Sequence, residues 1–127
     1  MVTISNNGFI SLTRGDSFSV PLFINMGTGM APVRYSLLEH PETEIYLGVM
    51  EPNQPFEKAL IRKKYTHESR INENGDLMID FTGTDTEYIV PGKYFYQIKA
   101  KFIDKETGIN VDTIVSKKQF IVRDWGI

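Results

Sequence analysis

The amino-acid sequence predicts an all-β fold, an antiparallel β-sandwich of about seven to eight strands. Apolar and polar residues alternate with a period of two along most of the chain, which is the pattern of half-buried strands. Clusters of Gly, Pro, Asn and Asp separate these runs at the short intervals typical of sandwiches. A chain of 127 residues has the length of one domain. We therefore expect residues 1–127 to form a single sandwich domain.

The first two strands are predicted on either side of the sequence "TRGD". The run "SFSVPLFI" (17–24) alternates cleanly, and the run "GFISL" (8–12) before it has the same period. Pro21 has no amide proton, so this strand should have an unpaired edge or a bulge there. Gly15 and Asp16 are residue types that tight reversals favour, so the two strands are predicted to form a hairpin.

Arg14, Gly15, Asp16 and Ser17 also spell the adhesion signal that integrin receptors read. Receptor binding requires the Arg and Asp side chains to project from the tip of a loop, whereas a structural turn requires only the backbone freedom of Gly and a local bond from Asp. We favour the structural turn, with Asp16 bonded within it.

Two strands are predicted in the middle of the chain, "TEIYLGVM" (43–50) and "ALIRKKYT" (59–66). The alternative for the second is a helix that starts at "PFEK", and the alternation of Ile61 and Tyr65 against Arg62 and Lys64 favours the strand. A turn at "NGD" (74–76) then leads into "LMIDF" (77–81), whose apolar residues share one face.

The C-terminal third predicts the longest strand and a final strand with a bulge. Pro91 and Gly92 turn the chain into "KYFYQIKAKF", in which Tyr94 and Tyr96 begin the inward face. A tyrosine at such a corner can bond its hydroxyl to nearby backbone, which favours an immunoglobulin-like topology over a barrel. The last run, "VDTIVSKKQFIV", slips phase near Ser116, which predicts a β-bulge.

Composition excludes several classes of function. The 14 basic and 16 acidic residues give a net charge of −2, so the chain has no electrostatic signature for nucleic acid or an anionic membrane. No run approaches the ~18 apolar residues of a membrane span. The absence of cysteine excludes disulfides and sulfur-ligated metals. The run "IRKKY" (61–65) could track a phosphate backbone, but it is better interpreted as a strand whose charges protect a sheet edge.

The sequence predicts no catalytic, cofactor or metal site. His40 and His67 lie in polar, loop-like sequence, and no Gly-x-Ser-x-Gly elbow is present. Asp80, Asp85 and Glu87 could bind calcium or act as an acid–base pair, but their spacing is unspecific and no Asp-x-Asp-x-Asp-Gly loop is present. We favour an outward Asp80 and a polar turn at 84–87. We expect a protein that is not an enzyme.

Four aromatic residues are predicted to face away from the core. They are Phe23, Tyr46, Phe95 and Trp125. A single sandwich rarely exposes so much apolar area, so these residues are candidates for a protein interface.

The chain resembles the immunoglobulin-like N-terminal domain of baseplate upper proteins of phages and prophages of Gram-positive bacteria. The resembling segments are "RGDSFSV", "PNQPFEKALIRKKYT", "NGDLMIDF", "DTEYIVPGKYFYQIKAKF" and the final "KKQFIV". The resemblance implies structural roles for Gly15, Asp16, Pro91, Gly92 and the two tyrosines Tyr94 and Tyr96. It implies no catalytic residue.

From these observations we expect a structural component of a phage or prophage tail or baseplate. Such a protein would be synthesised in the host cytoplasm and would function in the virion, bound to other virion proteins in a homo- or hetero-oligomer, without nucleic acid, membrane or cofactor. The alternative is a carbohydrate-binding or capsid-decorating domain that attaches to glycans of the host surface.

Overall fold

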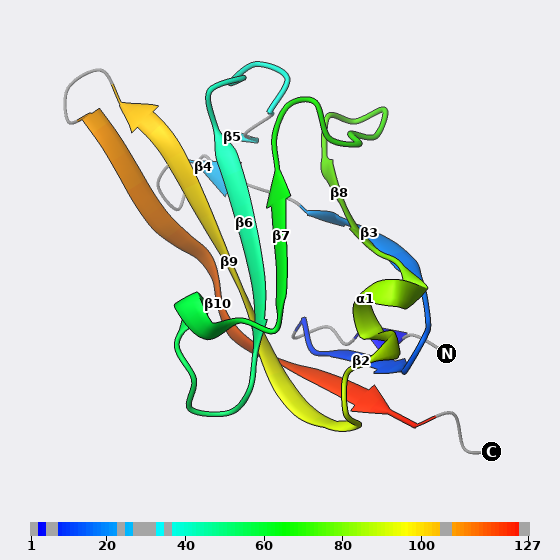
Figure 1. Ribbon diagram of the computed structural model, residues 1–127. Coiled ribbons are helices and arrows are strands. Elements are labelled where there is room, and N and C mark those ends of the chain that lie inside the picture. The colour runs from blue at the N-terminus through cyan, green and yellow to red at the C-terminus, as the bar shows by residue number, and fades with distance from the viewer. Residues whose placement is uncertain are drawn as a thin grey trace.

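The computed structural model of the protein describes residues 3–4, 8–22, 25–26, 33–34, 37–104 and 108–124 (Figure 1). Its elements are, in chain order, β1 (Thr3–Ile4), β2 (Ile10–Thr13), β3 (Phe18–Leu22), β4 (Asn25–Met26), β5 (Val33–Arg34), β6 (Glu44–Met50), the 3₁₀ turn η1 (Phe56–Lys58), β7 (Ile61–Tyr65), β8 (Leu77–Phe81), the one-turn helix α1 (Gly83–Glu87), β9 (Gly92–Asp104) and β10 (Gly108–Arg123).

The described strands form one large sheet and two small ones. The large sheet has the order β1-β2-β10-β9-β6-β7, β3 pairs with β8, and β4 pairs with β5. All these pairs are antiparallel except β2 and β10, which run parallel. The large sheet is therefore mixed, whereas the sequence predicted only antiparallel pairing.

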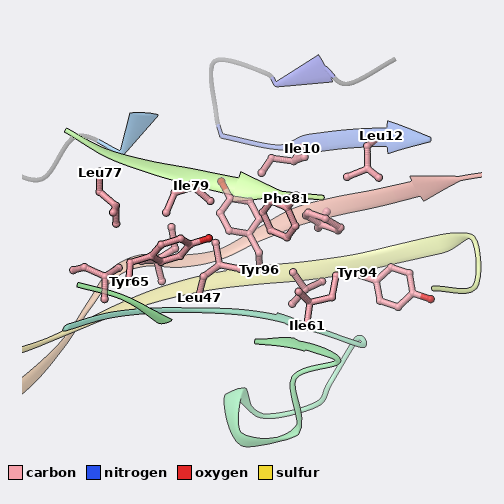
Figure 2. Close-up of a cluster of buried hydrophobic side chains, with 14 of the residues drawn as sticks. Ile10, Leu12, Leu47, Ile61, Tyr65, Leu77, Ile79, Phe81, Tyr94 and Tyr96 are labelled. Carbon is pink, nitrogen blue, oxygen red and sulfur yellow. The ribbon is translucent and has the colours of Figure 1, made fainter. Parts of the chain in front are cut away.

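The apolar core lies between the pair β3–β8 and the large sheet. Figure 2 shows Leu77, Ile79 and Phe81 of β8 pointing toward Tyr96 and Leu47 of the large sheet. These side chains alternate with polar ones along each strand, so each strand presents one apolar face to the other layer. The buried residues are Ile10, Leu12, Leu37, Ile45, Leu47, Val49, Ile61, Tyr65, Leu77, Ile79, Phe81, Tyr94, Tyr96, Ile98, Ala100, Phe120 and Val122.

This arrangement confirms the predicted all-β, sandwich-like fold. Residues 61–65 form a strand, as the alternation of Ile61 and Tyr65 indicated, and only η1 before it is helical. Pro21 lies on β3, which pairs with β8 alone among the described strands, so its missing amide proton falls on a strand with an unpaired side. The pairing of β9 with β10 shifts register between Thr113 and Lys118, which confirms the predicted bulge.

The predicted hairpin of the first two strands is wrong. β2 joins β10 in the large sheet, whereas β3 joins β8 in the small one. The turn at Gly15 therefore carries the chain from one layer to the other. Alternation shows which side chains point inward, but it does not show which strand lies alongside, and here the two runs contact the core from opposite layers.

Tyr94 fixes the corner where the chain enters β9. Its hydroxyl donates a hydrogen bond of 2.5 Å to the carbonyl oxygen of Val90, four residues upstream. Burial of the ring raises the pKa of Tyr94, so this hydroxyl stays protonated and remains a donor at neutral pH. The predicted corner tyrosine is confirmed.

We expect Tyr94→Phe to lower the free energy of unfolding by about 0.5–1.5 kcal/mol, because it removes this bond and leaves the Val90 carbonyl without its donor. Urea denaturation followed by fluorescence measures the change. Tyr88→Phe is the matched control, since Tyr88 is 85% exposed. Equal effects of the two substitutions would contradict a role for the corner bond.

Candidate interaction surfaces

The Arg-Gly-Asp turn is bound to the body of the protein. The Asp16 carboxylate accepts a 2.9 Å hydrogen bond from the backbone NH of Thr13, which lowers the pKa of Asp16. Arg14 forms an ion pair of 3.2 Å with Asp124, beyond the end of β10. Gly15 has φ +91°, a conformation that favours glycine. This confirms the predicted turn at Gly15 and the local bond of Asp16.

The same turn packs against α1. The backbone NH of Gly15 donates a 3.0 Å hydrogen bond to the hydroxyl of Thr86, which is fully buried. An added Cβ at Gly83 would lie only 2.7 Å from the carbonyl oxygen of Gly15. The two segments therefore touch through their backbones, and the turn is part of the framework.

Two of the predicted interface residues lie on the outer face of the large sheet. Tyr46 and Phe95 are both partly buried, on the side of β6 and β9 that faces away from the core. The amine of Lys64 lies 5.9 Å from the ring centre of Tyr46, and that of Lys93 lies 6.0 Å from the ring centre of Phe95. The structure therefore places a lysine of the same chain over each ring.

The other two predicted interface residues, Phe23 and Trp125, lie outside the described residues. Of the predicted turn residues, Pro91 lies at a bend before β9, whereas Gly92 is already the first residue of β9 and pairs with Val122; both are exposed.

A hollow of about 350 Å³ lies on the outer face beside η1. Gly48 of β6 and Phe56 both line it, and the ring of Phe56 packs directly over this glycine, where an added Cβ would lie 2.8 Å from the ring. The hollow is lined by Tyr46, Leu47, Gly48, Phe56, Glu57, Ala59, Arg62, Lys63 and Lys64. Its lining is thus mainly apolar with a basic rim.

One side of this hollow carries a small charged network. Glu44 accepts hydrogen bonds from the Tyr46 hydroxyl at 2.5 Å and from Lys64 at 2.9 Å, and both bonds lower the pKa of Glu44. The bond to Glu44 raises the pKa of Tyr46 and that of Lys64. Glu44 therefore compensates the charge of Lys64.

Two of the three carboxylates considered as a calcium or acid–base site, Asp80 and Asp85, form ion pairs with cations. Asp80 pairs with Arg70 at 3.1 Å, and Asp85 pairs with Lys63 at 2.7 Å. Burial raises the pKa of Asp85, but its bonds from Lys63 and from the backbone of Thr82 outweigh this effect, and the net shift is downward. In the part of the chain that the structure describes, no three His, Asp or Glu residues lie close enough to hold a metal ion.

The two histidines are surface residues on loops. His40 lies 3.9 Å from the Glu42 carboxylate, and His67 is exposed in the turn after β7.

The strands β9 and β10 form a two-stranded ribbon that extends past its neighbours. β6 pairs with β9 only as far as Lys101, and β2 pairs with β10 only from Phe120 to Arg123. Apart from β9, no described strand pairs with residues 108–113 of β10. Figure 1 shows the ribbon diverging from β6 toward the upper left. Ile109 and Val111 are 64% and 60% exposed there.

Comparison with family models, with curated proteins and with solved structures finds no match to this chain. Among the residues that the structure describes, no helix has the length and apolar character that crossing a membrane requires.

Sequence reasoning did not single out Ile109, Val111 or Thr86. Val111 looks like an ordinary strand residue, and Ile109 was expected in the turn "DKETGIN" (104–110), whereas β10 already begins at Gly108. Thr86 lies in a polar segment that we expected to be a turn, and its segment is the helix α1. No local pattern could have shown that its hydroxyl meets Gly15, 71 residues away.

Proposed function

We propose that this protein is a non-catalytic structural subunit of a phage or prophage tail or baseplate. It assembles with other proteins of the particle, and the β9–β10 ribbon supplies a contact surface.

The observation that carries the proposal is the exposed apolar edge of the ribbon. An unpaired strand edge offers a row of backbone donors and acceptors to another chain, and proteins commonly protect such edges with charge or cover them. Ile109 and Val111 place two β-branched apolar side chains on this part of β10, where a cover would be expected. A partner protein that packs on the ribbon buries both.

The assignment to a phage particle is supported by the resemblance of the segments around Gly15 and Pro91 to the baseplate family. Gly15, Asp16 and Tyr94 have structural contacts of the kind that the resemblance implies for them, and these contacts support the proposal.

The test is incorporation into particles. Particles from the phage or induced prophage that encodes the chain are purified by density gradient, and the chain is measured in them by quantitative mass spectrometry. We expect the wild-type chain to be present, and the double variant Ile109→Lys/Val111→Lys to be depleted about tenfold or more, as for loss of ~1.4 kcal/mol of contact energy.

Tyr88→Lys is the control, because it adds a charge at an exposed apolar residue away from the ribbon. Thermal unfolding of each purified variant shows that it is folded. Absence of the wild-type chain from purified particles would refute the proposed function, and equal depletion by Tyr88→Lys would refute the role of the ribbon.

The second candidate is a carbohydrate-binding or capsid-decorating domain attached to the host surface. The hollow between Tyr46 and Phe56 favours it, because aromatic rings at a surface depression suit the apolar face of a sugar.

A further inference from the structure

Residues 108–113 of β10, "GINVDT", form a strand edge that lacks the usual protection against pairing with another chain. Among the described strands only β9 pairs with them, on one side. At the end of the large sheet, β7 carries Arg62, Lys63 and Lys64. On the unpaired side of the small sheet, β3 carries Pro21, which has no amide proton. Such cations and prolines hinder edge pairing, and residues 108–113 contain neither.

The apolar side chains of this edge lie on the face that points away from the core. Asp112 pairs with Ala100 of β9, whose side chain is part of the core. Cross-strand partners share a face, and successive residues of a strand lie on opposite faces. Ile109, Val111 and Thr113 therefore lie together on the outer face, where all three are exposed.

Symmetry restricts how this edge can pair with the same edge of a second copy. A two-fold axis between identical antiparallel strands stands perpendicular to the sheet, so one residue lies opposite itself. Two registers pair most of the segment, one with Asn110 at the axis and one with Val111. The Asn110 register places Asp112, the only charged residue of the segment, opposite Gly108, which has no side chain. The Val111 register places Asp112 opposite Asn110, whose amide is a donor for a carboxylate.

We propose that residues 108–113 of β10 pair with the same residues of a second copy of this chain, antiparallel and with Val111 at the two-fold axis. Each Ile109 then lies opposite Thr113 of the second copy, so every outer-face residue of the edge meets another β-branched residue. This contact closes after two copies, whereas pairing of β10 with β7 of another copy would continue without closing. The inference names the partner of the ribbon and rests on the proposed function for the ribbon as a contact surface.

Cysteine cross-linking tests the register, because the natural chain has no cysteine. In the proposed register the two Val111 Cβ atoms lie about 4.5–5.5 Å apart, close to the separation that a disulfide needs. We expect Val111→Cys to form a disulfide-linked dimer when oxidised glutathione is added. Ile109→Cys alone should not, because its two copies would lie about 14 Å apart along the strands, but a mixture of Ile109→Cys and Thr113→Cys should. Tyr88→Cys, at an exposed residue away from the ribbon, measures cross-linking by chance collision.

Two substitutions of Asn110 have opposite expected effects on the dimer. Asn110→Lys places a cation opposite each Asp112 of the second copy and should lower the dimer Kd about tenfold, whereas Asn110→Asp places two carboxylates together and should raise it about tenfold. Sedimentation velocity of the full chain, at concentrations up to about 1 mM, measures the Kd even of a weak dimer. The gain by Asn110→Lys cannot result from a misfolded protein.

A wild-type chain that stays monomeric throughout, or Val111→Cys that cross-links no faster than Tyr88→Cys, would overturn the proposal. Cross-linking of Ile109→Cys with Val111→Cys in place of the expected pairs would overturn the register. If the chain is monomeric while Ile109→Lys/Val111→Lys is still depleted from particles, the ribbon binds a different protein, and the proposed function stands. Absence of the wild-type chain from particles refutes the proposed function without changing the dimer, so the two proposals fail separately.

Discussion

Phe120→Ala is expected to lower the free energy of unfolding by about 3–5 kcal/mol, the largest effect of any single substitution proposed here. Phe120 is completely buried on β10. Its ring lies 5.6 Å from that of Phe81 and 6.4 Å from that of Tyr96. Phe81 in turn stacks on Phe18 at 4.9 Å, so the rings form a continuous row between the two layers.

Truncation at Phe120 removes the middle of this row and leaves a cavity between two sheets that cannot collapse freely. Since small domains have only ~5–15 kcal/mol of stability, we expect a fall in Tm on the order of 10–20 °C. Thermal and urea denaturation followed by circular dichroism measure both quantities.

Val111→Ala on the same strand is the matched control, because Val111 is largely exposed and its truncation should change stability by no more than ~0.5 kcal/mol. A loss below ~1 kcal/mol in Phe120→Ala, or a comparable loss in Val111→Ala, would show that the core does not lie where the structure places it.

Gly83→Ala is expected to destabilise the protein by about 1–3 kcal/mol, although alanine is the better helix former by ~1 kcal/mol. The new Cβ would lie 2.7 Å from the backbone oxygen of Gly15, well inside contact distance. The turn at Gly15 cannot shift easily away from the new Cβ, because the Gly15 amide is hydrogen-bonded to Thr86 and the Asp16 carboxylate to Thr13.

Gly92→Ala is the control for this prediction. Its added Cβ would meet nothing closer than 3.8 Å, so the substitution should be nearly neutral. Urea denaturation of both variants measures the difference. Equal stabilities would mean that the Gly15 turn and α1 do not touch through their backbones.

Much of the fold could be predicted from the sequence because side-chain alternation reports burial directly. The inward faces of the strands at 77–81 and 94–100, the bulge before Phe120 and the tyrosine corner at Tyr94 all follow from local pattern. Strand neighbours could not be predicted in the same way. The pairing of β2 with β10 depends on contacts between distant segments, which alternation does not encode.

The candidate surfaces were predicted less well, for a related reason. Alternation placed Tyr46 and Phe95 on the outer face, but not the lysines that lie over their rings. Lys64 and Tyr46 come from the neighbouring strands β7 and β6, whereas Lys93 and Phe95 both lie on β9. The packing of Phe56 on Gly48 requires the loop before β7 to fold back over β6, and only the three-dimensional path of that loop determines this contact.

The parallel pairing of β2 with β10 has a consequence for how the chain reaches its native state. Ile10 lies beside Phe120, so the large sheet is closed by a contact between segments 110 residues apart. The ribosome must release residue 120 before this contact can form. Until then the apolar face of β2 lacks its neighbour, so the large sheet closes only after β10 has been synthesised.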